Sequence, residues 1–97
     1  MNKFTHYDSA DIAAYLDAVM LESEDDPAFI MQALGVVARA RNFSQLARDA
    51  GITREGLYKA LSENGNPSFA TVAKIVNALG LHIKFASTKQ AKVIKNK

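Results

Sequence analysis

Hydrophobic residues recur at helical spacing along most of this chain, which predicts a succession of short amphipathic helices. The first expected helix follows a cap at Asp8 or Ser9 and ends near Leu21, with apolar residues at every third or fourth position. The second begins at Pro27, because proline tolerates the first helical position, and ends near Arg41. Its expected buried side chains are Phe29, Ile30, Leu34, Val37 and Ala38.

Two shorter helices are expected between Ser44 and Leu61, joined by a tight turn. The small side chain of Ala47 allows the two helices to cross closely, and Gly51 can adopt the positive φ that ends a helix. Leu57 then faces back into the angle between the helices. This spacing is typical of a helix-turn-helix, whose second helix lies in the major groove of DNA.

Hydroxyl side chains stand where three of the helices should begin. We expect Ser44 to cap the first helix of the pair and Thr53 the second, because each hydroxyl can accept from a free backbone N–H. Ser68 should cap a final helix that Gly80 ends. The apolar stripe of that helix contains Phe69, Val72, Ala73, Val76 and Leu79, and we expect Phe69, Ile75 and Leu79 in the core.

The pattern changes to a period of two after Gly80. Leu81, Ile83 and Phe85 alternate with His82 and Lys84, which predicts a strand. A single strand must pair its N–H and C=O groups with something. We expect exchange with a second copy about a two-fold axis, because cyclic dimers are the commonest oligomers. The dimerisation residues would be Leu81, Ile83 and Phe85, and the alternatives are a strand of another protein or residues 4–7 of this chain.

Polar side chains on the outer face of the second short helix point to a DNA contact. With Leu57 inward, this face presents Arg54 and Glu55, which can bond guanine and cytosine N4, and Tyr58 and Lys59, which can bond phosphates. The alternative interpretation is an ordinary helical corner with a solvated face. The full set of expected DNA-binding residues is Ser44, Gln45, Thr53, Arg54, Glu55, Tyr58, Lys59 and Asn64.

Length and composition indicate one small globular domain. The chain has 97 residues, of which 48% are hydrophobic, and we expect an all-α fold of five helices with the terminal strand. The expected domain spans residues 1–87: N-terminal helices at 8–42, the helix-turn-helix at 44–61, and a helix with the strand at 68–87. Residues 88–97 would form a basic, flexible tail.

Charge is distributed unevenly along the chain. Residues 1–33 carry one lysine against seven acidic side chains, a net charge of −6, whereas residues 34–97 carry eleven lysines and arginines against three acidic side chains, a net charge of +8. A basic body suits a polyanion such as DNA. The acidic segment suits either a basic protein partner or a rim that faces away from DNA, and simple solubility explains it equally well.

Several classes of function find no support in the residues. There is no cysteine, so disulfides and cysteine-ligated zinc are excluded, and the two histidines lack neighbours that would complete a metal site. No catalytic residues, phosphate-binding glycine loop, cofactor or small-molecule substrate are indicated, so we do not expect an enzyme. No apolar run approaches the length of a membrane span, and the N-terminus lacks a signal-peptide pattern. A soluble cytoplasmic protein is expected.

From Tyr7 to Phe85 the chain resembles the addiction-module antidote proteins, antitoxins of the HigA-like type in the phage-repressor (XRE) class of helix-turn-helix domains. The resemblance covers about four-fifths of the chain. It is most specific in its second half and ends before the basic tail. The matching runs are Tyr7–Ala10, Ile12–Leu16, Asp26–Ile30, Ala33–Gly35, Ala38–Arg41, Leu57–Ser62, Gly65–Val72 and Ala78–Leu81.

The resemblance implies two activities. Such proteins bind and neutralise a small basic toxin, usually of the RelE/ParE type, in a type II toxin–antitoxin module. They also bind double-stranded DNA at their own promoter as dimers and repress their operon. The alternative hypothesis is a free-standing transcriptional regulator of the phage-repressor type without a toxin partner.

Overall fold

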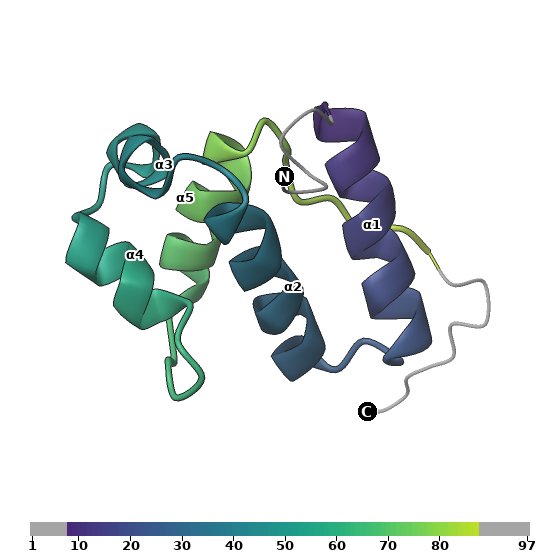
Figure 1. Ribbon diagram of the computed structural model, residues 1–97. Helices are drawn as coiled ribbons and strands as arrows, with labels where there is room; N and C mark the ends of the chain where they lie inside the picture. Colours follow the sequence, from purple (N-terminus) through teal and green to yellow (C-terminus); the bar gives the residue numbers. More distant parts are fainter. Residues whose placement is uncertain (1–7, 88–97) are drawn as a thin grey trace.

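The computed structural model describes residues 8–87, which form five helices. They are α1 (Ser9–Glu22), α2 (Pro27–Arg39), α3 (Phe43–Ala50), α4 (Arg54–Ala60) and α5 (Phe69–Ala78). Helices α1 and α2 form an antiparallel pair on one side of the molecule, and α3, α4 and α5 gather on the other side of α2 (Figure 1). The expected succession of five helices is confirmed.

The helix starts depend on side chains that accept from free backbone N–H groups. Asp8 caps α1 in a capping box with Asp11, in which each carboxylate accepts from the backbone N–H of the other residue. Asp26 caps α2 directly before Pro27, and Ser68 caps α5. These three starts lie where the sequence predicts them.

An entirely apolar core joins the helices. Its largest fully buried side chains come from four of them: Ile12 in α1, Leu34 and Val37 in α2, Leu57 in α4 and Ile75 in α5. Helix α3 adds three further buried residues, Leu46, Ala47 and Ala50. The buried positions of α2 and α5 follow the helical period, so the hydrophobic pattern itself directs the packing.

Two aromatic side chains that we expected in the core are exposed. Phe29 retains 49% of its surface and Phe69 retains 68%. Both lie in the first turn of their helices, where the chain enters from a loop and no neighbouring helix covers them. Helix α2 also ends at Arg39, two residues before the expected end, and Arg41 follows in a bend.

The segment after α5 forms no strand within the single chain. Gly80 ends the helix with a φ of 87°, and residues 81–87 continue without regular structure. Ile83 and Phe85 are exposed, Phe85 to 89%. Pairing with a second copy therefore stays a prediction. The alternative partner, residues 4–7, lies outside the described residues.

Burial of Leu57 predicts a large cost for its truncation. Leu57→Ala should lower the free energy of unfolding by about 2–5 kcal/mol, because the fully buried side chain leaves a cavity among several helices. Urea denaturation monitored by circular dichroism measures this loss. Leu21→Ala makes the same chemical change at a side chain that is 81% exposed and should cost under about 0.5 kcal/mol. Similar losses in both variants would contradict the packing described here.

Candidate nucleic-acid interface

A tight turn at Gly51 sets the relation between α3 and α4. Gly51 has a φ of 74°, and its N–H donates to the carbonyl oxygen of Arg48 at 3.1 Å. The N–H of Ile52 donates to the carbonyl oxygen of Ala47 at 3.0 Å. These bonds satisfy carbonyls that the end of α3 would leave open, so the chain reverses into α4 within three residues.

Of the two caps expected for α3 and α4, one is confirmed and the other is wrong. Thr53 caps α4 as expected, and its Oγ1 accepts from the N–H of Gly56 at 2.8 Å. The prediction for Ser44 as a cap is wrong: Asn42 caps α3, and its Oδ1 accepts from the N–H of Gln45 at 3.0 Å. Asparagine is as good a cap as serine, and its position starts the helix two residues earlier than a cap at Ser44 would, at Phe43.

Helix α4 turns one side to the core and leaves the opposite side exposed. Leu57 and Ala60 are buried. Since successive residues turn by about 100°, Glu55 and Lys59 lie almost opposite Leu57. Arg54 and Tyr58, also exposed, lie together on one flank. The four polar residues expected on this helix are therefore all at the surface, on two adjoining stripes.

Arg54 is held against α3. Its Nε donates to the Oγ of Ser44 at 3.0 Å, and its guanidinium carbon lies 5.5 Å from the centre of the Phe43 ring. This distance is within the range of cation–π attraction. Ser44, expected as a cap, thus orients the arginine instead. Phe43 contributes to the site without having been predicted, because its contact depends on how two helices cross.

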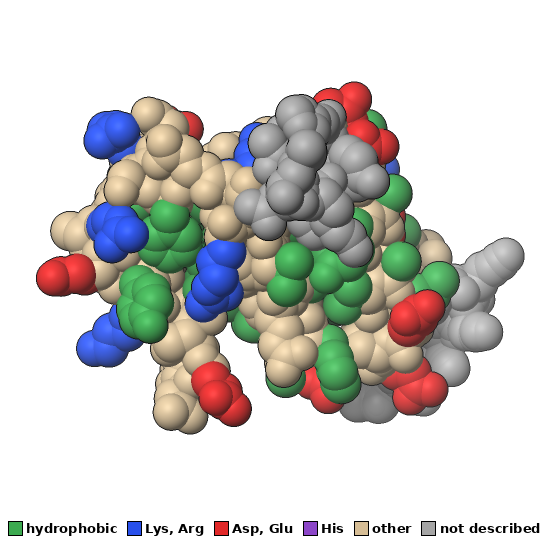
Figure 2. Space-filling view, in the orientation of Figure 1, with side chains coloured by type: hydrophobic (Ala, Val, Ile, Leu, Met, Phe, Trp, Pro, Cys, Tyr) green, Lys and Arg blue, Asp and Glu red, His purple; other side chains and the backbone are tan. Residues whose placement is uncertain are grey.

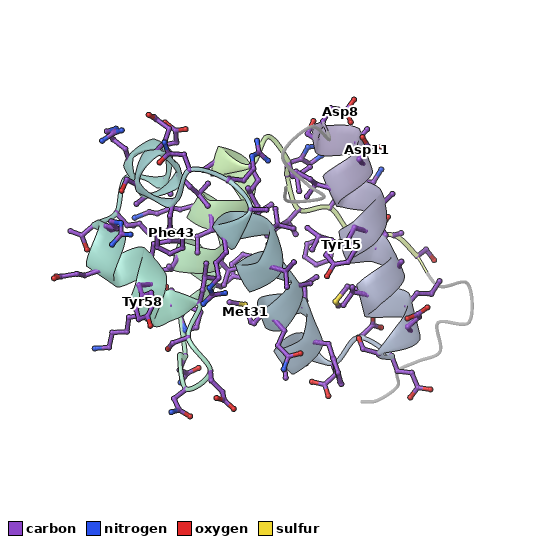
Figure 3. The ribbon with its side chains drawn as sticks, in the orientation of Figure 1. Asp8, Asp11, Tyr15, Met31, Phe43 and Tyr58 are labelled. Atoms are coloured by element: carbon purple, nitrogen blue, oxygen red, sulfur yellow. The ribbon has the colours of Figure 1, made fainter. Side chains whose placement is uncertain are left out.

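Arg39, Phe43, Arg54 and Tyr58 line an open depression of about 270 Å³. It lies where the end of α2 meets α3 and α4, and the rings of Phe43 and Tyr58 are both on this face (Figure 3). The sequence alone favours an interaction of Arg39 with the dipole at the end of its helix over a contact with phosphate. No sequence signal links it to Tyr58, since 18 positions and two turns separate them.

Two other expected DNA contacts occupy different environments. Gln45 is exposed, and its amide bonds two neighbours on α3: Nε2 donates to Asp49 at 2.8 Å and Oε1 accepts from Arg48 at 2.9 Å. Asn64 is exposed in the loop between α4 and α5, which extends away from α3 (Figure 1). The structure therefore brings Ser44, Arg54 and Tyr58 to one face and leaves Asn64 apart from them.

Charge is segregated in space as it is in sequence. Figure 2 shows Lys and Arg side chains over α3 and α4 with a smaller number of acidic side chains beside them, whereas Asp and Glu side chains predominate over α1 and the turn that follows it. Among residues 8–87, every acidic side chain is exposed. The arrangement offers a positively charged face at α3 and α4 and an acidic one at α1.

Comparison with known proteins identifies the family. A family model described as a probable addiction module antidote protein matches residues 2–87. The chain belongs to this family. An uncharacterized protein of Haemophilus influenzae is 53% identical over 81 residues, which cover 84% of this chain and 81% of the relative. No solved structure matches the chain.

Within residues 8–87, no three His, Cys, Asp or Glu side chains gather as a metal site would require. None of the helices of that part of the chain is long and apolar enough to cross a membrane.

The positive φ of Gly51 gives a prediction for the turn of this antidote protein. Gly51→Ala should destabilise it by about 1–2 kcal/mol, because an L-residue is strained in the left-handed region. No atom lies within 4 Å of the added Cβ, so the cost reflects backbone strain alone. Gly51→Asn should cost less, since asparagine tolerates this conformation. Denaturation midpoints compare the two variants, and an alanine variant as stable as glycine would refute the argument.

Proposed function

We propose that this protein is the antitoxin of a type II toxin–antitoxin module, which binds its toxin directly and represses its own operon by binding DNA. The family match carries the antitoxin half of the proposal. The toxin is a small basic protein of the RelE/ParE type, an assignment that rests on family resemblance. The positively charged face at α3 and α4 supports the DNA-binding half.

In this proposal α4 is the recognition helix. Leu57 anchors it with no exposed surface, while Glu55 and Lys59 point directly away from the core. A helix that is held on one side and polar on the other fits the major groove, where side chains bond base edges. The fixed turn at Gly51 holds α3 beside it, so Gln45 can reach a phosphate once it exchanges its bonds to Asp49 and Arg48.

Dimerisation would place two recognition helices on successive turns of one DNA face. Ile83 and Phe85 are exposed, and among residues 8–87 no backbone hydrogen bond involves residues 82–86. Both observations support strand pairing between copies, because unpaired N–H and C=O groups can pair with a second chain. Two-fold symmetry in the protein would then match a palindromic operator.

The acidic surface around the α1–α2 turn is the proposed toxin-binding region. Glu22, Glu24, Asp25 and Asp26 are exposed there, together with the apolar side chains of Leu21 and Phe29. A basic protein would be attracted by the carboxylates, and it would cover two hydrophobic side chains that water now surrounds.

Arg54 provides the first test of DNA binding. Arg54→Ala should cost about 1.5–3 kcal/mol of DNA binding, the range for a hydrogen bond to a charged group. The measurement is a titration of duplex DNA from upstream of the protein's own gene, followed by fluorescence anisotropy. Lys74→Ala removes one positive charge from an exposed position on α5 and should have a much smaller effect. Equal affinities for the wild type and Arg54→Ala would remove α4 from the interface.

Growth of a bacterial host tests the antitoxin half. Expression of the small basic protein encoded beside this gene should arrest growth, and co-expression of the antitoxin should restore it. A harmless neighbour would leave the free-standing regulator as the better interpretation.

Charge reversal on the antitoxin, followed by measurement of its affinity for the toxin, tests whether the toxin binds the acidic surface around the α1–α2 turn. Asp25 and Asp26 are poor sites for charge reversal, since Asp25 has a φ of 66° and Asp26 caps α2. Glu22→Lys is better, because a cation is favoured in the last turn of a helix. It should weaken toxin affinity about two- to fivefold, the scale of an exposed ion pair. Glu63→Lys, in the exposed α4–α5 loop, is the matched control and should leave toxin affinity unchanged.

A further inference from the structure

We propose that the depression lined by Arg39, Phe43, Arg54 and Tyr58 holds one phosphate of the DNA backbone, with Arg39 as the residue that bonds it. The inference rests on the DNA binding proposed above and adds to it a contact from α2, outside the α3–α4 pair. The four lining residues come from three helices, and none of them carries a negative charge.

A glycine one turn earlier on the same helix leaves room for the side chain of Arg39. One of its Nη atoms would lie 2.6 Å from a Cβ added at Gly35, so the guanidinium occupies space that a side chain there would fill. Within residues 8–87 this guanidinium makes no hydrogen bond or ion pair. Its donors are therefore available to an anion that enters the depression.

The opposite wall has the groups that a phosphate and its sugar require. The Nε of Arg54 donates to Ser44, and this bond does not use the Nη donors of the arginine. Tyr58 contributes an exposed hydroxyl. Guanidinium groups bond phosphate oxygens in a planar fork, and phenolic hydroxyls donate singly. Phe43, partly buried beneath Arg54, offers an apolar surface on which a deoxyribose ring can pack.

Groove dimensions favour a DNA phosphate over a carboxylate of a protein segment. A helix with its side chains is about 10–12 Å across, and the major groove is about 12 Å wide. When Glu55 and Lys59 face the bases, the flanks of α4 must face the phosphate backbones. Arg54 and Tyr58 form one such flank and open onto the depression, so the backbone passes directly over Arg39.

The salt dependence of binding tests this role. Arg39→Gln should weaken binding about tenfold near 0.1 M salt, as expected for one charge-assisted hydrogen-bonded contact. The loss should be equal for the upstream duplex and for a scrambled duplex of the same length. The magnitude of the slope of log K against log salt concentration should fall by about 1, the amount expected when one phosphate contact is lost. Lys74→Gln removes the same charge from α5 and should leave the slope unchanged.

Each other outcome would overturn the inference. An unchanged slope in Arg39→Gln, with wild-type DNA binding intact, would remove Arg39 from the interface and leave the proposed function standing. A loss confined to the upstream duplex would mean that Arg39 contacts a base. Intact DNA binding with weaker self-association or toxin binding would assign the depression to an acidic protein segment. If the wild type bound neither duplex, the proposed repressor function would fail as well.

Discussion

Burial of Leu57 is the interaction on which the proposed DNA-binding face depends. Helix α4 has seven residues, far fewer than an isolated helix needs to be stable in water. Its structure must therefore come from packing, and Leu57 is the only residue of α4 without any exposed surface. The cap at Thr53 and the turn at Gly51 determine where the helix begins. Anchoring from one side leaves the polar residues of the other side free to bind.

The side chain of Arg54 is held in place before any partner binds. Ser44 and Phe43 hold Arg54 against α3, and Gly35 leaves room for the guanidinium of Arg39 on α2. Ordering a long side chain costs conformational entropy, and a site that has already ordered it loses less on binding. Arg54 therefore differs from an ordinary exposed cation, although it lies at the surface.

The two oppositely charged surfaces suit an antitoxin that must bind two different partners. Acidic side chains predominate over α1 and its turn, and positively charged ones predominate over α3 and α4 (Figure 2). With α2 between these regions, toxin and DNA could be bound by separate faces of one small domain. Such separation agrees with an antitoxin that represses its operon while it holds its toxin.

Local signals in the sequence determined the helices, most of their caps and much of the core. Asp8, Asp26, Thr53 and Ser68 cap helices because a short acceptor side chain meets a free N–H a few residues away, and Gly51 reverses the chain because it tolerates positive φ. Tertiary structure alone decided what lies between helices. The exposure of the aromatic residues Phe29 and Phe69 depends on whether another helix reaches the first turn, which periodicity cannot show. Arg39, Phe43, Arg54 and Tyr58 meet because three helices cross at one place, and that geometry is set by the packing of the whole core.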